Sequence, residues 1–129
     1  MSQTVFPTFK YADARAVIDW LERVLGAERV AVYEDDAGRV AHAEVRIGEN
    51  AVMLGDREDG TATPPGAVVT YVVVADADAS HRRAVEAGAD VSGEPVEQDY
   101  GSRDFSVTDP EGNVWALGTY AGIAASRAP

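Results

Sequence analysis

The sequence contains no cysteine among its 129 residues. This absence excludes disulfide bonds, thiolate nucleophiles and zinc sites built on cysteine, and it fits a reducing compartment. No apolar run approaches the roughly 20 residues that a transmembrane helix needs. The first ten residues, MSQTVFPTFK, lack a basic segment followed by an apolar core, so we expect no secretory signal. Together these absences predict a cytoplasmic protein with no membrane partner.

Basic residues are scarce as well. The chain has 11 lysines and arginines against 22 aspartates and glutamates, which gives a net charge of −11 and a pI near 4.4. A surface this acidic repels phosphate backbones, so we expect no nucleic-acid partner. It would attract a cationic ligand, although solubility alone is the simpler explanation. With 46% hydrophobic residues, the composition is that of one globular domain.

The chain consists of two related halves. The segment FKYADARAVIDWLERVLGAE in the first half resembles YVVVADADASHRRAVEAGAD in the second, since each has an apolar run, Ala-Asp-Ala and a helical pattern. Asp13 then corresponds to Asp76, and Asn50 corresponds to Asn113; the numbers differ by 63 in both pairs. Two independent landmarks at one offset indicate a duplicated half-domain.

Each half is predicted to fold as β-α-β-β-β. Asp13 is the expected N-cap of the first helix, and Gly26 is expected to end it. The apolar residues between them recur at three- and four-residue spacing, as on one face of a helix. Alternation and turn residues predict the other elements. In the first half these are strands at 5–11, 29–34, 40–47 and 51–55; in the second, strands at 68–74, 89–91, 103–108 and 114–120 and a helix at 77–87.

The turn DPEGN at 109–113 follows the aromatic-containing segment SRDFSVT. With the repeat and the two Ala-Asp-Ala junctions, it resembles the vicinal-oxygen-chelate superfamily of glyoxalases, extradiol dioxygenases and bleomycin-resistance proteins. The resemblance implies an α+β fold, in which two tandem βαβββ modules form a rolled, half-open mixed sheet around a cavity. It implies a single domain at 1–129, with modules at about 4–55 and 67–120, a linker at 56–66 and a tail at 121–129.

The metal-dependent members of that superfamily carry ligands on the first and last strands of each module. Carried over to this sequence, the resemblance places those positions at Phe6, Met53, Val69 and Ala116. None of these side chains offers the carboxylate oxygen or imidazole nitrogen that divalent cations prefer. We therefore expect no metal and no cofactor, and the nearest branch is that of the metal-free bleomycin-resistance proteins.

Strand alternation predicts which side chains share the cavity face with these four positions. On the first strands of the two halves these are Thr8, Lys10 and Tyr71, and on the last strand, at 114–120, Tyr120. The resemblance adds three residues from the segment before the turn: Ser102, Asp104 and Ser106. Asp104 has three interpretations that the sequence leaves open: a partner for a cationic ligand, a base with a raised pKa, or half of a salt bridge to Lys10 or Arg103.

Histidine and tryptophan are expected to have structural roles here. His42 alternates with Glu44 and Arg46 on the polar side of its strand, together with Val40, and His81 is expected to pack partly under the second helix. Both tryptophans, at 20 and 115, are expected in the core. No nucleophile elbow or other nucleophile setting is present.

Three functions are compatible with this sequence. The leading hypothesis is a metal-free protein that binds an amphipathic or cationic compound, such as a bleomycin-type antibiotic, in an apolar cup. The resemblance implies a homodimer whose cavities draw on both copies. The alternative is a glyoxalase-superfamily enzyme: a lyase, isomerase or dioxygenase, or a metal-free enzyme with Asp104 or Tyr71 as acid or base. A regulatory or structural partner domain with a filled cup is the third.

Overall fold

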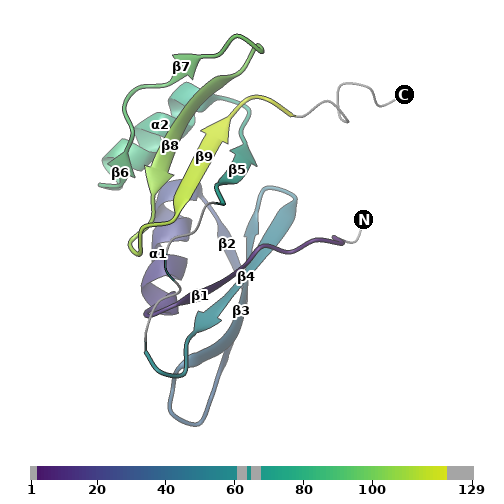
Figure 1. Ribbon diagram of the computed structural model, residues 1–129, viewed down its shortest axis with the longest axis vertical. Coiled ribbons are helices and arrows are strands. Elements are labelled where there is room, and N and C mark those ends of the chain that lie inside the picture. The colour runs from purple at the N-terminus through teal and green to yellow at the C-terminus, as the bar shows by residue number, and fades with distance from the viewer. Residues whose placement is uncertain (1–2, 61–63, 65–67, 122–129) are drawn as a thin grey trace.

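The computed structural model describes residues 3–60, 64 and 68–121 (Figure 1). Two sheets are each accompanied by one helix, so the α+β class is confirmed. The first half contains β1 (Thr8–Tyr11), α1 (Ala14–Leu25), β2 (Glu28–Glu34), β3 (Val40–Ile47) and β4 (Asn50–Asp56). The second half contains β5 (Thr70–Val73), α2 (Ala77–Glu86), β6 (Asp90–Val91), β7 (Val96–Glu97), β8 (Arg103–Thr108) and β9 (Val114–Gly118).

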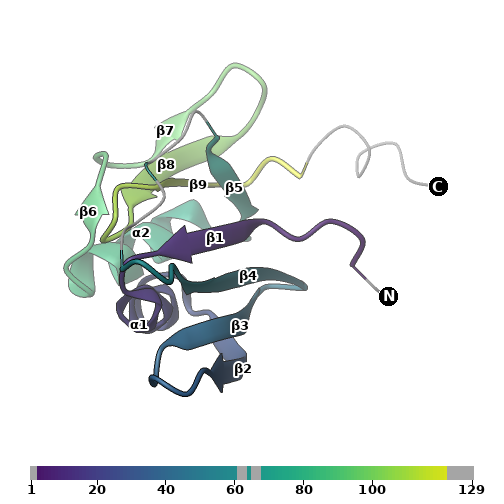
Figure 2. The same cartoon turned by 60° about the horizontal axis from the view of Figure 1, so that its bottom comes forward.

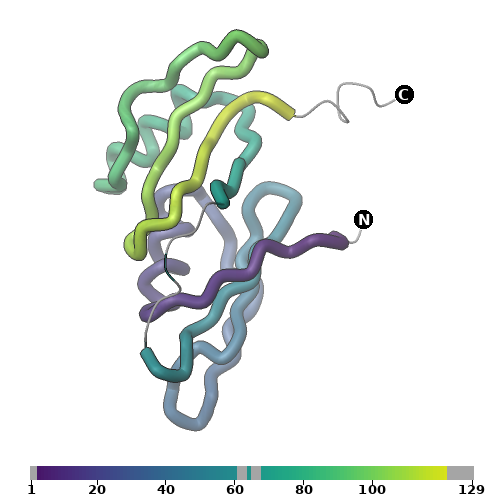
Figure 3. The backbone as a smooth tube through the Cα atoms, in the orientation of Figure 1, coloured from purple at the N-terminus to yellow at the C-terminus, as the bar shows by residue number. Residues whose placement is uncertain are grey.

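The two sheets have corresponding topologies. The first sheet has the order β1-β4-β3-β2, and the second has β5-β9-β8-β6, with β7 also paired to β8. In each sheet the first strand runs parallel to the last one, and the remaining pairs are antiparallel. Thr8 lies beside Met53 and Tyr71 lies beside Ala116, so the repeat offset of the sequence is preserved in three dimensions. Figure 3 shows the course of the backbone through the two halves.

Helix α1 has an N-cap, a C-cap and an apolar stripe that all specify the same segment. The Asp13 side chain accepts a hydrogen bond from the backbone N–H of Ala16 at 3.1 Å, and Gly26 adopts the left-handed conformation at φ 68°. Its apolar stripe is buried: Ala14, Val17, Ile18, Trp20, Leu21 and Val24. Helix α2 is also capped, by Asp76, but it buries only two alanines. No helix within the described ranges is long and apolar enough to cross a membrane.

One hydrophobic core serves both halves. The Trp115 ring is fully buried, stacks on Phe9 at 5.2 Å between ring centroids and lies 6.4 Å from the Trp20 ring. The helices pack against each other, and the Arg83 guanidinium donates to the backbone carbonyls of Glu22 and Arg23. Both tryptophans are therefore core residues, as predicted. In Figure 2, β1 is the strand of the first sheet nearest to the second sheet.

Several boundaries differ from the expectation. Strands β1 and β5 begin at Thr8 and Thr70, so Phe6 and Val69 precede the strands that they were predicted to join. Strand β9 ends at Gly118, and β7 was not predicted. Five residues of the expected linker, 61–63 and 65–66, lie outside the described residues, as do residue 67 and the tail from 122 onward.

The prediction that Val40 lies on the polar side of its strand is wrong. Val40 is fully buried, whereas Ala41 is exposed. The cause is a shift in pairing, because Tyr33 lies opposite His42 while the next residue, Glu34, lies opposite Val40. The extra residue in β3 is a β-bulge, and it turns Val40 toward the core.

Candidate functional site

Each sheet has a face that turns away from the core, which we call its open face. In the second sheet Phe105, Val107, Trp115 and Leu117 point into the core and are buried. Alternation places Tyr71, Asp104, Ser106, Ala116 and Gly118 on the opposite side. Across the strands Tyr71 neighbours Ala116, which neighbours Ser106, and Asp104 lies opposite Gly118. Four predicted site residues therefore share this open face.

The open face of the first sheet carries a different set of side chains. Thr8 neighbours Met53, which lies opposite Glu44, and Lys10 lies next to Gly55. His42 is 3.0 Å from a Glu44 carboxylate oxygen and is half-buried. Three predicted site residues, Thr8, Lys10 and Met53, thus lie on this sheet and not in the cluster around Asp104.

The second histidine, His81, also packs against an aromatic side chain. The His81 ring meets the Phe105 ring edge-on, with 5.2 Å between centroids, so it packs beneath α2 as predicted. His42 stacks on Tyr33 at 6.3 Å in addition to its contact with Glu44.

The residues at the family's metal positions do not fit a divalent cation. The register places Thr8 beside Met53 and Tyr71 beside Ala116, two residues along from the predicted Phe6 and Val69. Neither version of the set contains a carboxylate or an imidazole, which are the ligands that zinc, iron or manganese prefers. Among the residues that the structure describes, no group of three or more histidine, aspartate or glutamate side chains is placed to hold a metal ion.

Asp104 lies at the centre of a hydrogen-bonded cluster. The Tyr100 hydroxyl donates to its Oδ2 at 2.6 Å, and the Tyr71 hydroxyl donates to its Oδ1 at 3.2 Å. The Ser102 hydroxyl also donates to Oδ1. The backbone N–H of Tyr120 donates to both the Tyr71 and Ser102 hydroxyl oxygens, at 3.2 and 3.1 Å. Strand β5, the loop before β8 and the end of β9 therefore meet at this carboxylate.

This cluster sets the protonation state of Asp104. Burial raises the pKa of the carboxyl group, but the hydrogen bonds from Ser102, Tyr100 and Tyr71 outweigh burial and hold that pKa below its usual value. The same hydrogen bond to Asp104 raises the pKa of Tyr100 to about 12. Asp104 is thus ionised and Tyr100 protonated at neutral pH, which is opposite to a base with a raised pKa.

The salt-bridge interpretation of Asp104 is also wrong. Arg103 instead pairs with Asp78 at 3.0 Å and Glu97 at 3.4 Å, on the side of the strand facing α2. Lys10 belongs to the other sheet. Within the described ranges no lysine or arginine forms an ion pair with Asp104, so its charge is stabilised by hydroxyl groups alone.

Gly118 provides the space that the cluster occupies. A methyl group at this position would overlap both Asp104 Oδ1 and the Tyr71 hydroxyl. Because Gly118 lies directly opposite Asp104 in the ladder, the absence of a side chain lets the carboxylate and the phenol lie over strand β9. Glycine in a strand interior often marks such a close approach.

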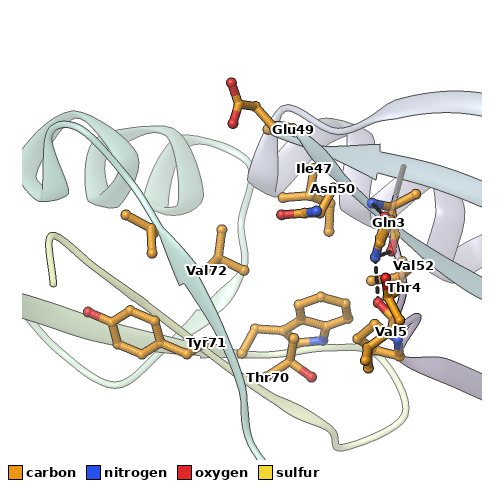
Figure 4. Close-up of a pocket in the computed structure, with 15 residues that line it drawn as sticks. Gln3, Thr4, Val5, Ile47, Glu49, Asn50, Val52, Thr70, Tyr71 and Val72 are labelled. Carbon is orange, nitrogen blue, oxygen red and sulfur yellow. Dashed lines mark hydrogen bonds between the residues drawn. The ribbon is translucent and has the colours of Figure 1, made fainter. Parts of the chain in front are cut away.

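Two hollows open near this region. The larger, of about 750 Å³, lies between the sheets, with Thr70, Tyr71 and Val72 on one side and residues 3–5, 7 and 47–52 on the other (Figure 4). The Gln3 side-chain amide donates to the backbone carbonyl of Ala51 at 2.8 Å and accepts from the Ala51 N–H at 2.7 Å. These polar groups of the hollow are therefore paired with each other. The acidic side chain in this lining, Glu49, is exposed, whereas Asp104 is partly buried and held by three hydroxyl groups.

The smaller hollow, of about 550 Å³, lies on the open face of the second sheet. Its lining consists of Tyr71, Val73, Tyr100, Tyr120 and Ala121. Apolar walls with a few convergent polar groups are typical of small-molecule sites, and here the polar groups are those around Asp104. We therefore take this hollow as the candidate binding site.

Tyr100 is the site residue that the sequence analysis missed. It lies four residues before Asp104, outside any strand and just before Gly101, which adopts a positive φ of 85°. Periodicity cannot identify such a residue. The available signal was an aromatic residue at a tight turn close to a carboxylate on a predicted cavity strand.

Comparisons with known proteins agree with this architecture. Residues 8–117 match the family described as the glyoxalase/bleomycin resistance protein/dioxygenase superfamily. An uncharacterized protein of Mycobacterium bovis is 33% identical over 115 residues, which cover 82% of this chain and 76% of that protein. The crystal structure of TioX from Micromonospora sp. ML1 has a TM-score of 0.72 at 26% identity, covering 93% of this chain and 98% of TioX.

A more distant structure shares the fold. The fosfomycin resistance protein FosX from Mesorhizobium loti has a TM-score of 0.70 at 19% identity, covering 98% of this chain and 97% of FosX. The family match spans both halves of the repeat and includes the DPEGN turn. The chain therefore belongs to the glyoxalase/bleomycin resistance protein/dioxygenase superfamily.

Proposed function

We propose that this protein binds a small amphipathic or cationic molecule on the open face of its second sheet, without a metal ion. A bleomycin-type antibiotic is an example of such a compound. The observation that carries the proposal is the Asp104 carboxylate. It is ionised, has no lysine or arginine partner among the described residues and accepts hydrogen bonds from Tyr71 and Tyr100, which line an aromatic hollow. The unsuitable donor set at the family's metal positions supports a metal-free member, of the bleomycin-resistance kind.

A homodimer is part of this proposal. Apolar and aromatic side chains are exposed on the open face of the second sheet, including Val73 at 54% and Tyr100 at 57%. Contiguous exposed apolar surface commonly marks an interface or a ligand site. A second copy of the chain would bury part of this surface and complete the wall of the hollow.

The enzyme alternatives have less support. A metal-dependent lyase, isomerase or dioxygenase needs ligands that Thr8, Met53, Tyr71 and Ala116 do not supply together. A metal-free enzyme with Asp104 as general base needs a pKa close to the working pH, whereas this pKa is lowered.

Metal analysis combined with ligand binding tests the proposal. We expect protein purified without chelators or a histidine tag to contain far less than one equivalent of zinc, nickel, manganese or iron by mass spectrometry. Metal-free bleomycin at about 100 times its Kd should stabilise the protein by about 2.7 kcal/mol, equally with and without EDTA. A near-stoichiometric metal whose removal abolishes binding would contradict the proposal and favour the enzyme.

A further inference from the structure

Three tyrosines surround the hollow beside Asp104. Tyr71 comes from β5, Tyr100 from the loop before β8 and Tyr120 from the segment after β9; they are 39, 57 and 36% exposed. The Tyr100 and Tyr120 rings meet edge to face, with 5.3 Å between centroids. We call these three tyrosines, together with Val73 and Ala121 of the same lining, the tyrosine cage.

Two of the three cage hydroxyls, those of Tyr71 and Tyr100, are committed to Asp104. Tyr100 and Tyr71 both donate their single hydroxyl proton to Asp104, and Ser102 donates to it as well. A carboxylate has about four acceptor sites, so three of them are already used. The cage therefore offers a ligand negative charge and aromatic surface, while most acceptor sites of the carboxylate itself are already taken.

This combination distinguishes between kinds of cation. A primary ammonium has three N–H donors that lose water on entering the cage, and the Asp104 carboxylate has only about one acceptor site left for them. A quaternary ammonium has no N–H groups, is attracted by the carboxylate and interacts favourably with aromatic faces. Hydrogen bonding of the phenols to a carboxylate also polarises the rings toward greater negative charge, which strengthens their attraction for a cation.

We propose that the tyrosine cage is a subsite for a fully substituted ammonium group, such as the trimethylammonium head of a larger ligand. The inference rests on the function proposed above, since it names the chemistry that this open face would select. It is supported by the three rings, by the hydroxyls committed to Asp104 and by the absence of a basic partner for that carboxylate in the described part of the chain.

Titration calorimetry of the full-length protein with three small probes tests this subsite. Choline carries the quaternary ammonium, ethanolamine carries a primary ammonium on the same carbon chain, and 3,3-dimethylbutan-1-ol replaces the nitrogen of choline with carbon. We expect choline to bind about tenfold more tightly than either of the others. Equal affinities for the three probes, or no measurable binding of choline, would overturn the inference.

Three variants test where choline binds and whether the Tyr100 ring is responsible. Tyr100→Leu should weaken choline binding about fivefold or more, whereas Tyr100→Phe keeps the ring and should retain most of the affinity. Tyr33→Leu is the matched control, because Tyr33 is exposed at 61%, lies on edge strand β2 and is not part of the cage. Circular dichroism and thermal melting verify folding. Equal effects of Tyr100→Leu and Tyr33→Leu would overturn the cage as the site.

Parallel titration with metal-free bleomycin separates this inference from the proposed function. Bleomycin binding without choline binding would overturn the cage and leave the metal-free binder in place. If neither compound binds, both proposals fail. Choline binding that depends on Tyr100 supports the cage whether or not bleomycin binds.

Discussion

Asp104 has its charge stabilised by neighbouring hydroxyl groups. Two donors, Tyr100 and Ser102, are close in sequence, and the third, Tyr71, is 33 residues away. Hydrogen bonds to a charged group are stronger than those between neutral groups. Asp104 can therefore remain ionised on a mostly apolar face, and its charge is available to a ligand.

The stabilisation by Asp104 should depend on pH in a defined direction. Its folded-state pKa lies below the usual value of 3.8, so the contribution is present above about pH 4 and is lost as the pH falls through the folded-state pKa. Asp104→Asn should lower the free energy of unfolding by about 1 kcal/mol at pH 7, because the amide accepts at one oxygen only. Urea denaturation should show this difference shrinking as the pH falls below about 4.

Asp36→Asn is the control for the pH series. Asp36 lies in the exposed turn between β2 and β3 and has no bonded partner in the described structure. Its variant should differ little from the wild type at any pH in the series. A difference for Asp104→Asn that grows toward acidic pH would mean that the carboxyl pKa is raised and not lowered.

At the scale of elements, the DPEGN turn joins the two halves. The buried Asp109 carboxylate accepts from the Tyr11 hydroxyl at 2.8 Å and from the Trp115 indole N–H at 3.2 Å. Burial, and then the charge of Asp109, raises the pKa of Tyr11, so its hydroxyl remains a donor. The residue corresponding to Asp109 in the first half is Arg46, so only the second half carries this connection.

The same turn caps α1 from the other half of the chain. The two Glu111 carboxylate oxygens accept from the backbone N–H groups of Ala12 and Asp13, each at 2.8 Å. A carboxylate at a helix N-terminus satisfies free N–H groups and interacts favourably with the helix dipole. The DPEGN turn therefore has a structural role in this fold.

Glu111→Ala tests this cap. We expect a loss of about 1 kcal/mol in the free energy of unfolding, measured with urea, because two N–H groups at the start of α1 lose their acceptor. Hydrogen exchange should accelerate in the first turn of α1. Glu94→Ala, in the exposed loop between β6 and β7, is the control and should change neither quantity. Equal exchange in both variants would show that Glu111 does not cap the helix.

At the scale of the whole molecule, the open face of the second sheet determines assembly in our proposal. We expect light scattering to give a mass of about twice the 13.7 kDa chain. Val114, on this face and 36% exposed, should be buried by the partner, so Val114→Asp should increase the monomer fraction. Val85→Asp, on the outer side of α2 where Val85 is 51% exposed, is the matched control. A single-chain mass for the wild type would contradict the dimer.

The sequence was sufficient to predict the repeat, the order of most elements, the caps of α1 and the core position of Trp20 and Trp115. These features depend on local patterns: apolar spacing, alternation and capping residues that operate within a few positions. The resemblance placed Asp104 and Ser106 on the cavity side of their strand, and in the structure they lie on the side of β8 opposite Phe105 and Val107.

The surroundings of Asp104 and Ser106 are known only from the tertiary structure. It placed Thr8 and Tyr71, rather than Phe6 and Val69, beside Met53 and Ala116, because strand pairing sets the register. It brought Tyr100 to Asp104 through a glycine turn and lowered the pKa of that carboxyl through hydroxyls from separate elements. The physical reason is that a site is formed by contacts between distant segments, and local patterns do not encode those contacts.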